Sequence, residues 1–275
     1  QNQDYDRALL DLSVFIYLNP NFSQAYYWRG LTYAGRGDAD AALGDLDAAI
    51  RYAYEDLYEA AYRAALFETT ARIHVSVEDF AAAEAAVSSA LDISPSVDNY
   101  VFRALLRSQL EDYEDALADV DAAAALADAE ALPSLYLTRA SINVTRANES
   151  AAAADYYAYI QSVETDTQRG DSLAVGSLVE LEMVQGRGYR ITVPLERGQL
   201  LTLLASPAEN SAVDPLLVLL GPDDTPVIAS DDVQPPDLTA FVQGYTVPAD
   251  GNYTFVISHA AGGSDGLLLA GYMTE

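Results

Sequence analysis

The segment Tyr26-Tyr27-Trp28-Arg29-Gly30-Leu31-Thr32-Tyr33 decides the fold of the first half of the chain. A turn at Gly37-Asp38 follows it, and then comes a second segment, Ala42-Leu43-Gly44-Asp45-Leu46. Apolar residues recur every three or four positions on both sides of the turn, which predicts two amphipathic helices. Gly30 is small enough to let the two helices approach closely. The stretch therefore predicts a helical hairpin.

The same pattern recurs through residues 1–164. An alanine followed four positions later by a larger apolar residue returns every 33 to 41 residues, at Ala8, Ala42, Ala83, Ala116 and Ala152. An arginine followed by a small residue recurs upstream, at Arg29-Gly30, Arg103-Ala104 and Arg139-Ala140. Hairpins repeated in this way stack on their neighbours, because none can bury its apolar face alone. We expect an all-α solenoid of a half repeat and four repeats.

These residues resemble the tetratricopeptide repeat, a helix-turn-helix unit that recurs along the chain. The resemblance covers residues 4 to about 163 and implies binding of a protein partner on the concave surface of the first helices. The positions that it places there are Tyr27, Leu31, Glu68, Arg72, Val101, Leu105, Leu137 and Ser141. Some members of the family grip a C-terminal carboxylate with lysine, which this chain lacks. An extended peptide or a partner helix fits the surface better.

Both ends of the expected solenoid carry apolar residues that the pattern leaves uncovered. The chain opens with only the second helix of a repeat, and no polar helix follows the last repeat, although solenoid ends normally need a polar cap. The residues concerned are Leu9, Leu12 and Ile16 at the first end, and Tyr156, Tyr157, Tyr159 and Ile160 at the other. Either the second domain or another chain covers these ends. Head-to-tail stacking of chains through them would build a filament.

Residues 177–275 predict an all-β domain, joined to the solenoid by a linker at 165–176. Seven or eight short apolar stretches, such as residues 200–204 and 253–257, alternate with turns at short and regular intervals, which is typical of a β-sandwich. The order from Tyr189 to Ile257 resembles the bacterial pre-peptidase C-terminal domain, a jelly-roll-like sandwich of secreted proteins. The expected fold class is multidomain α + β, an all-α solenoid followed by an all-β jelly-roll-like sandwich.

Composition excludes several classes of function. The net charge is −28, with 42 acidic residues, no lysine and no cysteine, and so strong a negative charge repels nucleic acid and anionic membrane surfaces. A disulfide framework, a zinc-thiolate site and a Schiff-base lysine are excluded outright. The missing cysteine, the start at Gln1 and the β-domain resemblance favour an extracellular, cell-surface or periplasmic protein. Four N-x-Ser/Thr sequons, at Asn21, Asn143, Asn148 and Asn252, agree with export.

No catalytic constellation emerges from the sequence. The two histidines, His74 and His259, fall in different domains. The G-x-S-x-G match at residues 262–266 precedes a strand, whereas a nucleophile elbow requires a helix after the serine. The acidic pairs Asp223-Asp224 and Asp231-Asp232 are either solvated turn residues or calcium ligands. The second alternative is considered because some members of the family that the β domain resembles bind calcium. We predict a non-enzymatic, exported scaffold that needs no cofactor and binds a protein partner. A filament subunit is the alternative.

Overall fold

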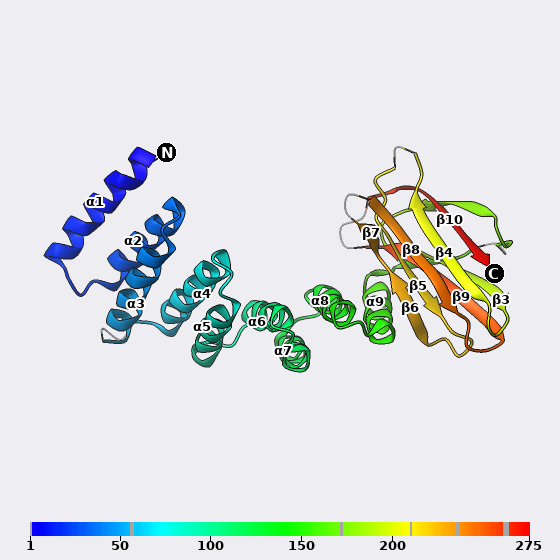
Figure 1. The fold of residues 1–275 in the computed structure, drawn as a ribbon, viewed down its shortest axis with the longest axis horizontal. Coiled ribbons are helices and arrows are strands. Elements are labelled where there is room, and N and C mark those ends of the chain that lie inside the picture. Colours follow the sequence, from blue (N-terminus) through cyan, green and yellow to red (C-terminus); the bar gives the residue numbers. More distant parts are fainter. Residues whose placement is uncertain (1, 56–57, 171–172, 210, 235–236, 261–263) are drawn as a thin grey trace. The chain divides into compact units, whose positions relative to one another are not determined.

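The computed structural model describes residues 2–55, 58–170, 173–209, 211–234, 237–260 and 264–275. Within these residues, nine α-helices precede ten β-strands (Figure 1). The helices are α1 (Asn2–Leu18), α2 (Ser23–Arg36), α3 (Ala39–Glu55), α4 (Ala60–Ser76), α5 (Phe80–Ile93), α6 (Val97–Gln109), α7 (Tyr113–Leu126), α8 (Leu132–Thr145) and α9 (Glu149–Val163). The predicted order of helices followed by strands is confirmed. No described helix is both long and apolar enough to cross a membrane.

Helices α2 to α9 form four hairpins, α2–α3, α4–α5, α6–α7 and α8–α9, and α1 packs against α2. The small residues make close packing possible, as expected. A Cβ atom at Gly30 would stand 3.1 Å from the carbonyl oxygen of Ala42. Leu46 and Leu66 are fully buried where the first hairpin meets the second.

The turns inside the hairpins share one backbone geometry. Gly37 has a φ of 89°, and the equivalent residues Glu78, Glu111 and Ala147 have φ values of 57° to 63°. In each case the next residue donates its backbone N–H to a carbonyl five residues earlier, as Asp38 does to Tyr33 at 2.9 Å. This left-handed residue ends the first helix, so each second helix leaves its turn in the same direction.

Ten strands follow, against the seven or eight expected. They are β1 (Asp166–Arg169), β2 (Leu178–Met183), β3 (Arg187–Leu195), β4 (Leu200–Pro207), β5 (Pro215–Leu220), β6 (Pro226–Ser230), β7 (Asp232–Gln234), β8 (Asp237–Thr246), β9 (Gly251–His259) and β10 (Gly266–Thr274). Sheet A has the order β1-β3-β9-β5-β6, and sheet B has the order β2-β10-β4-β8-β7. Residues of both sheets share one core, which includes Met183, Leu203 and Phe255.

The segment predicted as a linker is partly a strand. β1 pairs in parallel with β3, with Asp166 opposite Arg187. The ion pair between Arg190 and Glu164 (2.9 Å) and the bond from the Thr165 N–H to the Gly186 carbonyl (2.8 Å) fix the start of this segment. Residues 171 and 172 lie outside the described part of the chain. The segment from Glu164 to Gly170 is therefore integrated into the sheet.

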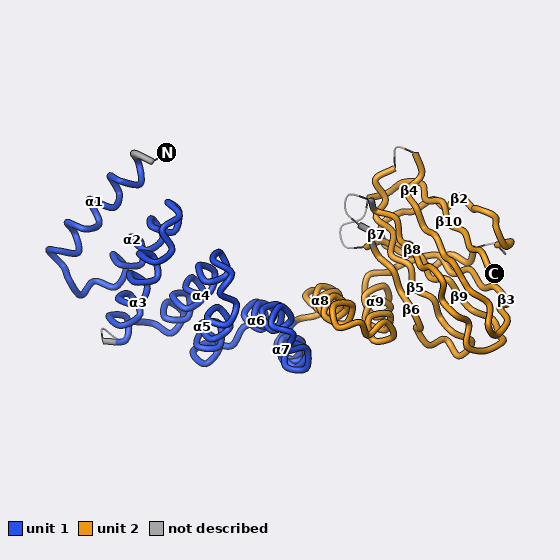
Figure 2. The backbone as a smooth tube through the Cα atoms, in the orientation of Figure 1, with its two compact units in different colours: residues 1–127 blue, residues 128–275 orange. Residues whose placement is uncertain are grey.

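The packing divides the chain at a different place from the composition. One compact unit comprises residues 1–127 and the other residues 128–275 (Figure 2). The last hairpin, α8–α9, belongs with the sheets because α9 packs on strands β5 and β6. The first unit thus contains α1 to α7, and the second unit contains one hairpin and both sheets.

Candidate interaction surface

The first helices of the first unit, α2, α4 and α6, contact one another in series. The Tyr62 ring of α4 lies 6.2 Å from the Tyr27 ring of α2, with an edge-on orientation. The amide of Asn99 on α6 donates to the Glu68 carboxylate on α4 at 2.8 Å. We call the exposed side of these three helices the first-helix surface. It contains Tyr27, Trp28, Leu31, Glu68, Arg72, Val101 and Leu105.

The predicted partner-binding residues of the first unit differ in their exposure. Leu105 is 45% exposed and Arg72 is exposed, with its guanidinium 5.6 Å from the Phe102 ring centre. Tyr27, Leu31, Glu68 and Val101 are half-buried, partly through the contacts between helices. Trp28 was not predicted to lie on this surface, but it is 57% exposed and lies 5.3 Å from the Tyr27 ring. Its signal was available, because Trp28 is the single tryptophan.

Two predicted partner-binding residues belong to the second unit. Leu137 is half-buried against the cluster formed by α9 and sheet A, whereas Ser141 is exposed. Leu137 therefore contributes to the core of the second unit. We restrict the first-helix surface to the residues of the first unit.

Buried ion pairs join the two helices of three hairpins, and two of these pairs lie behind the first-helix surface. Arg29 donates to both carboxylate oxygens of Asp45 at 2.7 Å, and Arg103 donates to both oxygens of Asp119 at 2.9 and 2.7 Å. Arg139 donates to Asp155 at 2.6 Å. The separation is 16 residues each time, and the aspartates are only 3% to 7% exposed. Hydrogen bonding to the aspartate raises the pKa of Arg29 and of Arg103.

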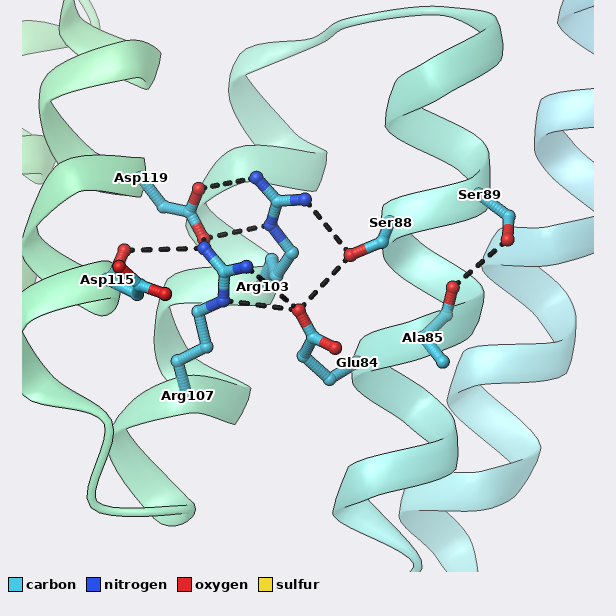
Figure 3. Close-up of polar contacts among 8 residues, drawn as sticks. All are labelled: Glu84, Ala85, Ser88, Ser89, Arg103, Arg107, Asp115 and Asp119. Atoms are coloured by element: carbon cyan, nitrogen blue, oxygen red, sulfur yellow. Dashed lines mark hydrogen bonds and ion pairs between the residues drawn. The ribbon is translucent and has the colours of Figure 1, made fainter.

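One of these pairs extends into the neighbouring hairpin (Figure 3). Arg103 also donates to the hydroxyl of Ser88 on α5 at 3.0 Å, and Ser88 donates to Glu84 at 3.1 Å. Arg107 links Asp119 (2.8 Å) to Glu84 (3.0 Å). This network joins α5, α6 and α7, so the α6 part of the first-helix surface is tied to both neighbours.

In the hairpin α4–α5 both members of this arginine–aspartate pair are replaced. Thr70 stands where the other hairpins have arginine and Ala86 where they have aspartate, and both residues are buried. The Thr70 hydroxyl bonds to the Leu66 carbonyl of its own helix at 3.0 Å. Removing one partner alone would leave an uncompensated buried charge. The repeated arginines were recognised in the sequence but their aspartate partners were not, although the spacing between them is constant.

The C-terminal end of the helical series is covered by the chain's own sheet. Ile160 is fully buried and Tyr159 is 6% exposed, packed with Leu216, Val218 and Val256 on the outer face of sheet A. Burial raises the pKa of Tyr159, with Asp231 and Asp214 adding to the effect. Tyr156 and Tyr157 are half-buried at the same contact. Of the two alternatives left open for this end, cover by the second domain or by another chain, the contact with strand β5 agrees with the first, so Tyr159 and Ile160 are not available as a free assembly surface.

The N-terminal end has a different apolar face from the predicted one. Leu9 and Ile16 are buried and Leu12 is half-buried. The exposed apolar residues of α1 follow them by one or two positions: Leu10 (64%), Val14 (52%), Tyr17 (85%) and Leu18 (68%). They recur at intervals of three and four residues, so they lie along one side of the helix. This stripe is a second candidate interaction surface.

Neither histidine lies in a catalytic arrangement within the described residues. His74, on α4, has its Nδ1 3.7 Å from Asp79. His259, at the end of β9, lines a cavity of about 360 Å³ with Tyr159, Gln185 and Ser258. Burial lowers the pKa of His259. Of the residues in the G-x-S-x-G match, 262 and 263 lie outside the described part, and a strand, β10, follows.

The other sequence candidates take part in local contacts. Among the described residues no group of three or more histidine, aspartate or glutamate side chains is arranged to hold a metal. The Asp223 carboxylate accepts a bond from the Thr225 hydroxyl at 2.6 Å, which lowers the pKa of Asp223. Asn143 is only 3% exposed and donates to Asp155 at 2.6 Å, so the folded chain cannot carry a glycan there. Asn148 caps α9.

Comparisons with known proteins give similarity to solved structures only. No protein-family model matches the chain, and no curated protein matches it. MamA from Desulfovibrio magneticus RS-1 is 15% identical with a TM-score of 0.48, over 57% of this chain and 85% of that chain. YrrB, described as a TPR protein with an unusual peptide-binding site, is 15% identical with a TM-score of 0.47, over 58% and 78%. The C-terminal part of a TPR repeat-containing protein from Cytophaga hutchinsonii is 14% identical with a TM-score of 0.47, over 58% and 60%.

Proposed function

We propose that the chain is a non-enzymatic scaffold that binds a protein partner on the first-helix surface. The observation that carries the proposal is the exposure of Trp28 (57%) and Leu105 (45%) on that surface, together with the exposed guanidinium of Arg72. Tryptophan, tyrosine and arginine are the residues that contribute most to protein interfaces. Large apolar side chains gathered on one side of a folded domain are typical of an interaction site.

The buried polar contacts behind the surface support this function. The Arg29–Asp45 and Arg103–Asp119 pairs fix α2 and α6 against their second helices, and the Asn99–Glu68 bond connects α6 to α4. A surface held in this way loses little conformational entropy when a partner binds. The net charge of −28 favours a partner with a positive charge, whose association slows as salt is added. We propose a basic peptide, either extended or helical, with apolar anchors.

Selection from a displayed peptide library against the full chain tests the proposal. The selected peptides should be rich in arginine or lysine and in large apolar residues. Their affinity should fall at least about tenfold when Trp28→Ala or Leu105→Ala removes an anchor. Leu126→Ala is the matched control, because Leu126 is similarly exposed (53%) but lies on the second helix α7. Peptides that bind both leucine variants equally well would contradict the proposed surface.

We also propose export of the protein, with residues 177–275 as a sandwich of the pre-peptidase C-terminal type. The support is the resemblance of residues 177–275 to that family of secreted proteins. Fractionation of the producing cells with an antibody to the chain tests the location, and recovery in the cytoplasm would contradict it.

We propose that folding requires no cofactor. A melting temperature that rises with calcium would instead assign a calcium site to the acidic loops.

A filament subunit is the second candidate, and the exposed stripe on α1 is the observation that favours it. Head-to-tail stacking through both helical ends would require α9 to leave sheet A, since Tyr159 and Ile160 are buried there. Negative-stain electron microscopy with light scattering tests the alternative. A monomer at every salt and protein concentration would rule out the filament.

A further inference from the structure

The cavity beside His259 lies in the second unit, where the C-terminal end of α9 meets the end of β9, the central strand of sheet A. Gln185 and Gly186, in the turn before β3, also line it. Its volume of about 360 Å³ falls within the range of sites that bind a small molecule, about 300 to 1,000 Å³. The cavity is therefore large enough for a small organic ligand.

The His259 side chain is the observation that points to such a ligand. His259 is only 6% exposed, and neither ring nitrogen has a hydrogen-bond partner among the described residues. The great majority of buried polar groups in folded proteins are hydrogen-bonded, because an unsatisfied one costs free energy. A ligand in the cavity would supply the partner that the ring lacks.

The ring is uncharged at neutral pH. Burial lowers the pKa of His259, and the nearby Val184 carbonyl and Asp265 carboxylate oppose that shift, although neither meets hydrogen-bond geometry with a ring nitrogen. A neutral imidazole has one N–H donor and one acceptor nitrogen. His259 can therefore bind a group that donates, accepts or does both.

The rest of the described lining selects a neutral ligand. Its polar groups are the hydroxyls of Thr165 and Ser258 and the amide of Gln185, and it contains no charged side chain. A cation would find no carboxylate there, and the net charge of −28 repels an anion. Tyr159 and Val163 provide an apolar wall on the α9 side. A sugar matches this lining, because its ring has C–H groups on its faces and hydroxyls at its edge, each both donor and acceptor.

We propose that this cavity binds a neutral, hydroxyl-rich small molecule, a single sugar residue, through His259, Thr165 and Ser258. A sugar hydroxyl pairs with the His259 nitrogen that faces the cavity. The terminal torsion of histidine has broad minima, so the ring can turn a nitrogen toward the ligand. The cavity belongs to the second unit and the first-helix surface to the first, so either proposal can fail without the other.

The chain has only two histidines, which makes a direct test possible. The full chain with isotopically labelled histidine gives imidazole NMR signals from two side chains, and His74→Gln assigns them. Titration with glucose, galactose, mannose and N-acetylglucosamine should shift the His259 signals to saturation for at least one sugar, while those of His74 stay in place. A dissociation constant of about 1 mM is expected for a ligand of this size. No shift at about 100 mM of any of these sugars would overturn the proposal.

Thr165→Val tests the lining with little risk to folding, because Thr165 is exposed and valine keeps its shape. Loss of the hydroxyl should weaken sugar binding about threefold or more. Thr167→Val is the matched control, because it removes an exposed hydroxyl that does not line the cavity. Equal effects of the two variants on the dissociation constant would contradict the proposed site.

His259→Phe removes the hydrogen bonds of the ring and keeps a planar ring in its place. Saturation-transfer NMR on the sugar should show binding at least about tenfold weaker than to the original chain. Undiminished binding to this variant would overturn the proposal. His259 signals that shift with zinc chloride but with none of the sugars would also overturn it, since the cavity would then hold a metal ion.

Discussion

The two end helices of the series, α1 and α9, have equivalent patterns but different surroundings. Phe15 in α1 and Tyr159 in α9 occupy the same position, yet Phe15 is 42% exposed and Tyr159 is 6% exposed. Sheet A supplies the cover that α9 needs, and nothing in the described chain covers the equivalent face of α1. The difference shows that a repeat helix can be completed by an unrelated element, provided that the element presents an apolar face.

The largest expected difference between the ends comes from the two aromatic residues. Tyr159→Ala should lower the free energy of unfolding of the second unit by about 3 to 5 kcal/mol, because it leaves a cavity against sheet A. Phe15→Ala should cost about 1 kcal/mol in the first unit, because much of the ring is already in water. Hydrogen exchange of α9 and β9 reports the first change, and urea unfolding followed by Trp28 fluorescence reports the second. Equal losses would contradict the comparison.

Asp155 in α9 and Asp11 in α1 occupy equivalent positions, and their replacement should change the free energy of unfolding by almost equally different amounts. Asp155→Ala removes the acceptor of both Arg139 and Asn143, and loss of one partner of a buried pair costs about 3 kcal/mol or more. Asp11→Ala should change the free energy of unfolding by no more than about 0.5 kcal/mol, since the carboxylate is exposed. Hydrogen exchange of α9 measures the loss for Asp155→Ala, and urea unfolding followed by Trp28 fluorescence measures the change for Asp11→Ala. A large loss for Asp11→Ala would show that this residue already has a partner in the folded chain.

The pH dependence of the α9–sheet contact should give a smaller effect. Burial lowers the pKa of His259, while the Val184 carbonyl and the Asp265 carboxylate oppose that shift. Below the ordinary histidine pKa of about 6.5, the unfolded chain therefore binds a proton that the folded chain does not. The free energy of unfolding should fall below that pH by at most about 1.4 kcal/mol per pH unit, until the folded pKa is reached.

His259→Gln provides the control for this prediction. Chemical denaturation between pH 7.5 and pH 5 should show a shallower decline for the variant than for the original chain, because the carboxylates titrate equally in both. Identical slopes would mean that His259 takes up its proton in the folded state as readily as in the unfolded state.

The repeats were predictable from the sequence because each hairpin repeats a local pattern. The Gly30 and Ala42 positions specify close helix packing, and the structure confirms the contact. The partners of Arg29 and Arg103 were missed because an acidic residue in a chain with 42 of them carries little information until its spacing is compared between repeats. In the hairpin α4–α5, Thr70 and Ala86 stand in place of the arginine and the aspartate. Both positions are buried, which explains why the two charged residues are replaced together.

The contact between α9 and sheet A had one visible signal in the sequence. The run Leu216–Leu220 lacks the alternation of a half-exposed strand, which indicates burial on both faces, and every residue of β5 is buried. Strand β1 had no comparable signal, since Asp166–Arg169 is polar throughout and exposed. Its position depends on pairing with β3 and on Glu164 binding Arg190, contacts that join residues about 20 to 26 positions apart.

Substitutions in the exposed stripe of α1 should have the smallest effect on stability. Their main effect should be on the association of chains with one another. The positions of Leu10 and Tyr17 are occupied in α9 by Ala154 and Gln161, both exposed. Leu10→Ala combined with Tyr17→Gln should leave the free energy of unfolding within about 0.5 kcal/mol. Salt screens the repulsion between chains of charge −28, so the original chain should begin to associate through the stripe as sodium chloride rises, while the variant stays monomeric. Light scattering across a salt series measures this, and association that is identical in both chains would place the contact elsewhere than on α1.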